Sequence, residues 1–344
     1  NITTIIACCV ALLYFQKNIE QALFIIMKKN YCIQFISLLI SIYFFSCANN
    51  SKIKSSSENL NEIKFTVEPA DDWTALFKRE HGWFGGDGIF FIPLNGRENI
   101  CADDSSETLI LFSDTVIGDI INDSLQHSSV SFIRNSFAIL KGKEPVAANI
   151  KFYWALDNGK PATGFVPKIA GVIPTDAYWL GDGFVNTATD SSLNIFAFLI
   201  RQTQYGLGFA EAGNAMITVN RNSQPPYSDY KQTATPFFLK PSADTALDYG
   251  SYGSGIFVNT KEAGASNPDG YVYVYGMRGK EKNVMVARVL PAEFSSFEKW
   301  RFYDGKNWNA DITTSANITD SASNELSLSP LPDGRYLSNF EGSL

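Results

Sequence analysis

The chain has 344 residues, of which 45% are hydrophobic and 18% are charged, and its formal net charge is −7. This length accommodates one large domain or two ordinary ones, and the apolar content is sufficient for a hydrophobic core. An acidic chain without basic runs is poorly suited to nucleic acid or to anionic lipid headgroups, so we expect no nucleic-acid partner.

The first predicted element is an export signal. Met27 is followed by two lysines, by an apolar run over residues 31–45 and by a serine before Cys47. This order resembles a bacterial lipoprotein signal, in which the cysteine becomes the lipidated first residue. We therefore expect a signal peptide over 27–47 and a lipid anchor in the cell envelope, at the outer membrane, as the only membrane contact. An ordinary cleaved signal or a single membrane anchor is the alternative.

The segments around this signal are predicted to lie outside the fold. Residues 1–26 are interpreted as upstream sequence that does not belong to the protein, or else as a second hydrophobic segment, and residues 48–62 are typical of a flexible polar tether. The folded domain is predicted over 63–344. After processing only Cys47 and Cys101 remain, which excludes a disulfide framework and a cysteine-based metal site. We expect no cofactor and no metal.

The pattern beyond the tether is that of an all-β protein. Short apolar or alternating runs are separated by clusters of Gly, Asn, Asp, Ser and Pro, which is typical of strands and their turns. Helical periodicity is absent, except that residues 292–300 are consistent with one or two helical turns.

The order of these predicted strands repeats along the chain. Successive units open with similar short segments, at residues 83–91, 178–185, 252–260 and 321–330. Four-stranded units repeated around an axis are the blades of a β-propeller. We therefore predict a five-bladed β-propeller that is truncated at its C-terminus, with about three and a half blades present. The alternative is a β-sandwich, whose strands would not repeat in this order.

Acidic residues recur where the predicted units open. Asp87, Asp182 and Glu325 occupy these positions, Ser254 occupies the third, and Asp114 follows the second strand of the first unit. The first strand of each propeller blade lines the central channel, so we expect these carboxylates to meet around one polar pit. Glycoside hydrolysis needs two carboxyl groups, one to protonate the leaving oxygen and one to attack the anomeric carbon or to activate water.

Aromatic and polar residues near the acids are the other predicted substrate contacts, because flat rings suit the apolar faces of sugars. In addition to Asp182 and Glu325, the predicted substrate contacts are Trp83, His127, Arg134, Asn135, Trp179 and Tyr252. Structural interpretations stay open for several of them. Asp182 alternatively serves as a turn residue, Glu325 as a solvated edge charge and His127 as a loop contact. Arg134 and Asn135 alternatively face solvent.

The order of several short segments resembles known families. The segments that carry the resemblance are residues 83–91, 109–115, 129–140, 178–185, 269–276, 284–289, 300–305 and 324–337. They resemble the DUF4185-type propeller families of bacterial lipoproteins, some of whose members degrade D-arabinan. They are similar, more remotely, to five-bladed glycoside hydrolases such as arabinanases and β-fructosidases. The resemblance implies that Asp87 and Asp114 are the catalytic acid pair.

Together these features predict a glycoside hydrolase that acts on a furanoside-containing polysaccharide such as arabinan, with that polysaccharide or its oligosaccharides as the partner. The alternative is a non-catalytic glycan-binding surface lipoprotein, in which the same acids and aromatic rings serve only as ligands. Two carboxylates about 5–10 Å apart that face one pocket would favour the enzyme.

Overall fold

The computed structural model describes residues 66–344 except 123, 205, 241–248, 332–335 and 341–344. The predicted signal peptide, the lipidation site Cys47 and the tether therefore lie outside the described residues. Residues 69–344 form one compact unit. In the described part of the chain, every helix is too short or too polar to cross a membrane.

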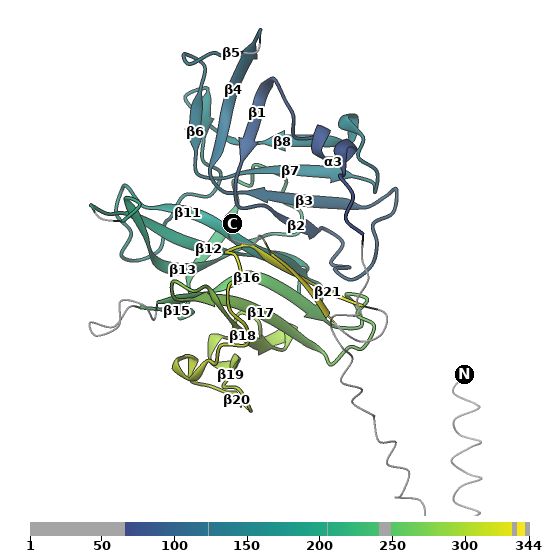
Figure 1. Ribbon diagram of the computed structural model, residues 1–344, viewed down its shortest axis with the longest axis vertical. Coiled ribbons are helices and arrows are strands. Elements are labelled where there is room, and N and C mark those ends of the chain that lie inside the picture. Colours follow the sequence, from purple (N-terminus) through teal and green to yellow (C-terminus); the bar gives the residue numbers. More distant parts are fainter. Residues whose placement is uncertain (1–65, 123, 205, 241–248, 332–335, 341–344) are drawn as a thin grey trace, which may run out of the picture. The chain divides into compact units, whose positions relative to one another are not determined.

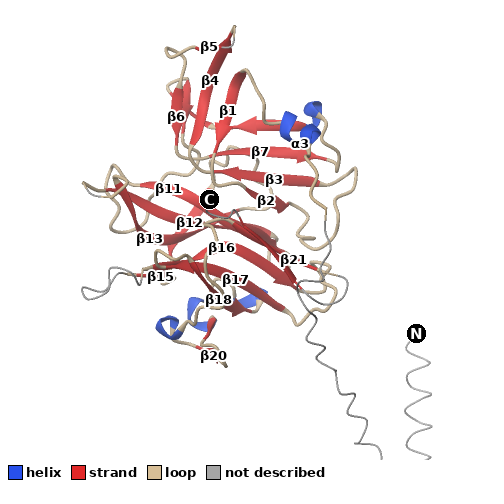
Figure 2. Cartoon of the chain, in the orientation of Figure 1, coloured by secondary structure: helices blue, strands red, loops and turns tan. Residues whose placement is uncertain are grey.

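Strands dominate the described residues, as Figure 2 shows. The longest helix among them is α3 (Asp71–Ala75), and the others are single turns. Two of these turns, Pro291–Glu293 and Phe297–Lys299, fall in or beside the segment predicted to be helical. The prediction of a mostly β protein built from antiparallel sheets is confirmed.

The chain first forms two antiparallel sheets of four strands each. The first sheet has the order β2-β3-β7-β8, with β2 (Phe90–Pro93), β3 (Glu107–Phe112), β7 (Ser136–Lys141) and β8 (Ile150–Tyr153). In the other sheet, β4 pairs with three partners, and its strands are β1 (His81–Gly86), β4 (Thr115–Ile121), β5 (Ser124–Leu125) and β6 (Ser131–Ile133).

Later sheets follow in chain order (Figure 1). A short hairpin comprises β9 (Ala155–Asp157) and β10 (Lys160–Ala162). The next sheet has the order β11 (Ala177–Asn186), β12 (Ser192–Gln202), β13 (Phe209–Val219), β14 (Tyr230–Ala234). A six-stranded sheet has the order β15 (Phe238–Leu239), β16 (Gly250–Asn259), β17 (Tyr271–Arg278), β18 (Asn283–Val289), β19 (Arg301–Tyr303), β20 (Trp308–Asn309). A last hairpin pairs β21 (Leu326–Pro330) with β22 (Tyr336–Phe340).

Four strands from four different sheets lie beside one another in chain order: β2 contacts β11, β11 contacts β16, and β16 contacts β21. Glycines permit this approach. A Cβ at Gly181 would lie 2.5 Å from the backbone oxygen of Gly253 in β16, and one at Gly255 would lie 2.7 Å from the backbone oxygen of Leu326 in β21. Only a residue without a side chain fits where two backbones come this close.

Three predicted strand assignments are wrong in detail. Residues 83–86 do not open the first four-stranded sheet, because β1 pairs with β4 in a separate sheet. The predicted strand over 129–140 is divided into β6 and β7, which belong to different sheets. Phe238 also pairs with Ser251, so β15 joins the six-stranded sheet and does not complete the preceding one. The contacts of the described residues establish successive sheets, and a five-bladed ring is not shown.

Apolar cores lie between neighbouring sheets. Ile92 and Leu109 of the first sheet pack with Ile195 of the β11–β14 sheet. Phe196 of that sheet packs with Val274 and with Trp300, a fully buried residue that precedes β19. The alternation of side chains along a strand explains these cores, because every second residue of a sheet points to the same face.

Substitution of Gly181 by alanine is expected to destabilise the domain. The new Cβ would lie 2.5 Å from the backbone oxygen of Gly253 in β16 and 3.0 Å from the ring of Phe198. Overpacking typically costs about 1–3 kcal/mol of unfolding free energy. The matched control is Gly85→Ala, since nothing lies within 4 Å of a Cβ there. Thermal unfolding should show a lower midpoint for Gly181→Ala only, and equal midpoints would contradict the close packing of β11 on β16.

Candidate functional site

Two contacting strands of neighbouring sheets, β11 and β16, each contain a β-bulge. The pairing of β11 shifts register between Leu180 and Gly183, and that of β16 shifts between Tyr252 and Gly255. Asp182 lies in the first bulge and Ser254 in the second, as their places in the sequence repeat predict. A bulge leaves backbone groups unpaired and turns side chains in new directions, so these positions differ from ordinary strand positions.

The carboxylate of Asp182 joins two strands. Its Oδ1 accepts a hydrogen bond from the backbone N–H of Gly183 at 2.8 Å, and its Oδ2 accepts one from Ile256 of β16 at 2.6 Å. Burial raises the pKa of Asp182 to about 7, although the two N–H donors oppose the rise. Both oxygens are therefore engaged by backbone, which matches the structural interpretation of this residue.

The two predicted catalytic acids adjoin each other. The backbone N–H of Asp87 donates to the carbonyl oxygen of Asp114 at 2.9 Å, and the N–H of Ser113 donates to the carbonyl of Asp87 at 2.6 Å. These two bonds keep the main chain of Asp87 beside that of Ser113 and Asp114. The side chain of Asp87 is exposed, and its Oδ1 accepts from the N–H of Gly88 at 2.8 Å.

Asp114 is held by two further side chains from the predicted set. Nη1 of Arg134 lies 3.1 Å from its Oδ1, and Nε1 of Trp179 donates to the same oxygen at 3.0 Å. The Asp114 side chain is 24% exposed and that of Arg134 is 40% exposed. We call Asp87, Asp114, Arg134 and Trp179 the Asp114 cluster. Donors on two sides fix the direction of the Asp114 carboxylate while leaving part of it open to solvent.

Two aromatic rings that sequence reasoning did not select border the Asp114 cluster. Phe209 meets Trp179 edge to face at 4.8 Å between ring centroids, and the guanidinium of Arg134 lies 5.1 Å from the ring of Phe132. Both phenylalanines are partly exposed, at 37% and 56%. Phe132 of β6 stands two residues before Arg134, which follows that strand, and this spacing is the only sequence signal for either ring.

Other predicted substrate contacts are covered by protein atoms. The ring of Trp83 is buried and stacks on Phe152 at 4.6 Å, while its Nε1 donates to Ser136. Tyr252 is fully buried, with its hydroxyl 2.7 Å from Oγ of Ser315. A sugar therefore cannot reach either ring in this structure.

The three remaining predicted substrate contacts, Asn135, His127 and Glu325, lie outside the Asp114 cluster. Asn135 is buried and its amide bonds the backbone of Phe165 and Tyr178, so it positions a loop. His127 is exposed in the turn between β5 and β6, and no contact within the described residues joins it to the Asp114 cluster. Glu325 lies nearer, since its Oε1 is 3.8 Å from the place a Cβ of Gly88 would occupy.

Buried carboxyl groups away from the cluster were not predicted. Burial raises the pKa of Glu98 well above its usual range, and the neighbouring Asp182 raises it further, against the N–H of Val185. Burial likewise raises the pKa of Glu211 to about 8, against the hydroxyl of Ser251. Oε1 of each glutamate is buried without a hydrogen-bond partner among the described residues. Glu98 follows β2 in a polar loop, where no pattern marks a buried position. No group of three or more acidic, histidine or cysteine side chains in the described ranges could hold a metal ion.

The fold and the cluster define a β-rich protein of successive antiparallel sheets with an open acid pair. The chain belongs to the family described as a domain of unknown function, DUF5005, whose model matches residues 70–340. A crystal structure from Bacteroides ovatus, described as a "putative hydrolase", is similar in fold, with a TM-score of 0.55 and 18% sequence identity. The similarity covers 79% of this chain and 66% of that protein. No curated protein matches the chain.

The family match corrects the resemblance stated above. The chain is a DUF5005 protein, and its assignment to the DUF4185-type families is wrong. The segments behind that assignment are Gly-Asp-Gly turns and alternating strands, which follow from turn chemistry and from the two-residue period of any sheet. Such features are shared by unrelated β proteins and do not distinguish one family from another.

The buried acids are expected to make the stability of the native domain fall as the pH rises. The raised pKa values of Asp182 and Glu211 mean that the native state keeps protons which the unfolded chain has lost. Their contribution to stability is therefore full below about pH 4 and is lost as the pH rises towards 7 to 8. Glu211→Gln should reduce this loss, so that the unfolding midpoint falls less between pH 5 and pH 8 than in the unmodified protein, by about 2 °C or more.

The control for this comparison is Glu262→Gln, which alters an exposed glutamate. Its midpoint should change with pH as that of the unmodified protein does. If Glu211→Gln and Glu262→Gln gave the same pH profile, the native carboxyl of Glu211 would not be the proton-holding group.

Proposed function

We propose that this domain is a β-propeller and that it hydrolyses a polysaccharide at the Asp114 cluster. Support for the propeller comes from four strands of four different sheets, β2, β11, β16 and β21, each of which contacts the next in chain order. The fold similarity to the Bacteroides protein agrees with a hydrolase, and it carries no information on substrate.

The observation that carries the proposal is the pairing of two aspartates at an open surface. Asp87 lies between β1 and β2, Asp114 lies between β3 and β4, and the backbone N–H of Asp87 donates to the carbonyl oxygen of Asp114. Glycosidases hold their two carboxyl groups about 5–5.5 Å apart when they retain configuration and about 6.5–9.5 Å apart when they invert it. Side chains that leave adjoining backbone positions can span either separation.

In the proposed reaction, one aspartic acid protonates the glycosidic oxygen as the bond to the anomeric carbon breaks. The other carboxylate attacks that carbon or removes a proton from the attacking water. Arg134 and Trp179 keep Asp114 aimed at the reacting centre, which lowers the entropy that the transition state loses. The rings of Trp179, Phe132 and Phe209 offer apolar faces beside the acids, where a sugar ring would pack.

We propose a furanoside-containing polysaccharide such as arabinan as the first substrate to test. The proposed setting is the cell envelope, with the domain tethered through a lipid on Cys47, because a lysine pair and an apolar run precede that cysteine. A glycan-binding protein without hydrolysis is the second candidate. It is favoured by the engagement of the Asp114 carboxylate with Arg134 and Trp179.

Asp114→Asn and Asp87→Asn should each lower polysaccharide hydrolysis by about 100-fold or more, because each removes a carboxyl group that acts in the transition state. The measurement is release of reducing ends from arabinans, fructans and other envelope or plant polysaccharides. Asp157→Asn is the matched control, since Asp157 is an exposed strand-end acid far from the cluster in sequence.

Hydrolysis that survives both cluster substitutions at full rate would rule out the acid pair. Retained binding with no hydrolysis by any form of the protein, including the unmodified chain, would instead assign the second candidate function.

A further inference from the structure

A second site lies at the other end of the strands that carry the Asp114 cluster. A pocket of about 400 Å³ opens where β2 and β11 end, beside Leu94 and Val185. Trp179 of the cluster lies near the start of β11, and a strand rises about 3.3 Å per residue. The pocket is therefore about 20 Å from the cluster, and the inference below does not rest on the proposed hydrolysis.

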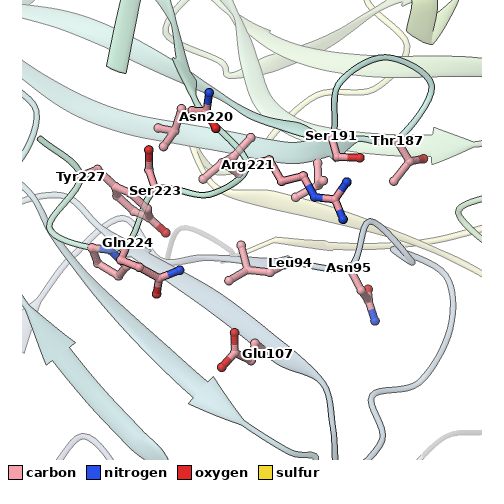
Figure 3. A pocket seen from close by; sticks show the side chains of 14 residues that line it. Leu94, Asn95, Glu107, Thr187, Ser191, Asn220, Arg221, Ser223, Gln224 and Tyr227 are labelled. Atoms are coloured by element: carbon pink, nitrogen blue, oxygen red, sulfur yellow. The ribbon is translucent and has the colours of Figure 1, made fainter. Parts of the chain in front are cut away.

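The pocket carries an uncompensated positive charge. Arg221 lines it, and its side chain points into the open space in Figure 3. Within the described ranges, Arg221 forms no salt bridge and no hydrogen bond through its guanidinium. The acid of the pocket, Glu107, is already neutralised by Lys141, whose Nζ lies 3.0 Å from its Oε1. A free guanidinium in an otherwise acidic protein is therefore left facing the cavity.

Neutral polar groups surround this charge. The ring of Tyr227 is buried, and its hydroxyl has no hydrogen-bond partner among the residues described. Burial raises the pKa of Tyr227, so its hydroxyl stays protonated and can donate at neutral pH. Asn95, Asn220 and Gln224 add amide groups to the lining, which Figure 3 shows around the opening. The side chain of Leu94 adds an apolar surface to the lining of the pocket.

We propose that this pocket binds a uronate, a monosaccharide that carries a carboxylate. A volume of about 400 Å³ is within the range of small-ligand sites. The planar guanidinium of Arg221 can bind a carboxylate through two parallel hydrogen bonds. The amides and the Tyr227 hydroxyl match the hydroxyl groups of a sugar, and Leu94 packs against its C–H face. A free uronate and a uronate at the end of an oligosaccharide share this chemistry.

The test measures the binding of galacturonate and of galactose to the full chain by ligand-observed NMR or by calorimetry. The two sugars differ only in the carboxylate, so the unmodified protein should bind galacturonate about tenfold or more tightly than galactose. Arg221→Gln should abolish this preference, a loss on the order of 10- to 100-fold in galacturonate affinity. Lys231→Gln, which removes an exposed charge from neighbouring β14, should keep it.

A second variant and a second ligand complete the design. Tyr227→Phe should weaken both sugars several-fold without changing the preference, and Asp87→Asn should bind as the unmodified protein does. If digalacturonate binds more tightly than galacturonate, the ligand of the pocket is the uronate at the end of an oligosaccharide. If the two bind equally, the ligand is the free sugar acid. Absence of galacturonate binding, or equal binding by Arg221→Gln with an unchanged unfolding midpoint, would overturn the proposal.

Discussion

The Asp182 carboxylate, which accepts backbone hydrogen bonds from two sheets, is the interaction on which the arrangement of the later sheets depends. It bonds Gly183 in its own strand and Ile256 in the next sheet. A buried N–H left without a partner costs about 1–3 kcal/mol, and a bulge creates such groups. One side chain therefore satisfies the bulge of β11 and holds β16 against it. Gly181 in β11 and Gly253 in β16 have no side chains, which allows these two strands to come close enough for the hydrogen bonds.

The same close approach assembles the Asp114 cluster. Oγ of Ser113 accepts a hydrogen bond from the N–H of Leu180 at 2.9 Å, which fixes the end of β3 beside β11. Asp114 and Trp179 are the residues next to this contact, so their side chains meet as a consequence of the strand packing. Arg134, at the break between β6 and β7, then reaches Asp114 from the other side. The cluster is built by main-chain contacts between sheets, and its geometry is correspondingly fixed.

Sequence reasoning predicted what depends on local pattern. It identified the strands β16 to β19 in order and the adjacency of Asp87 and Asp114. It did not predict that β1 and β4 leave the first sheet, because alternation identifies a strand without naming its partner.

A local sequence pattern also does not show which aromatic side chains are buried and which are exposed. Trp83 and Trp179 both precede a glycine-rich segment, yet one is buried against Phe152 and the other faces Asp114. The difference arises from which sheet covers each strand, and this information is absent from either local segment. Phe209 and Phe132 were missed for the same reason, since their exposure depends on neighbours far away in the chain.

The carboxylates predicted to share one pit lie in different surroundings, and Asp182 lies beside Glu98, an acid that was not predicted. Glu98 and Asp182 are close enough to raise the pKa of Glu98, and burial raises the pKa of both. Two such acids are compatible with a close-packed interior only when protons limit their mutual repulsion. Asp87 and Asp114 are open to solvent, and the second is oriented by a cation and an indole N–H. Acids that seemed equivalent along the sequence therefore differ in what binds them, since the Asp182 carboxylate accepts from the backbone of two sheets and the Asp114 carboxylate accepts from two side chains.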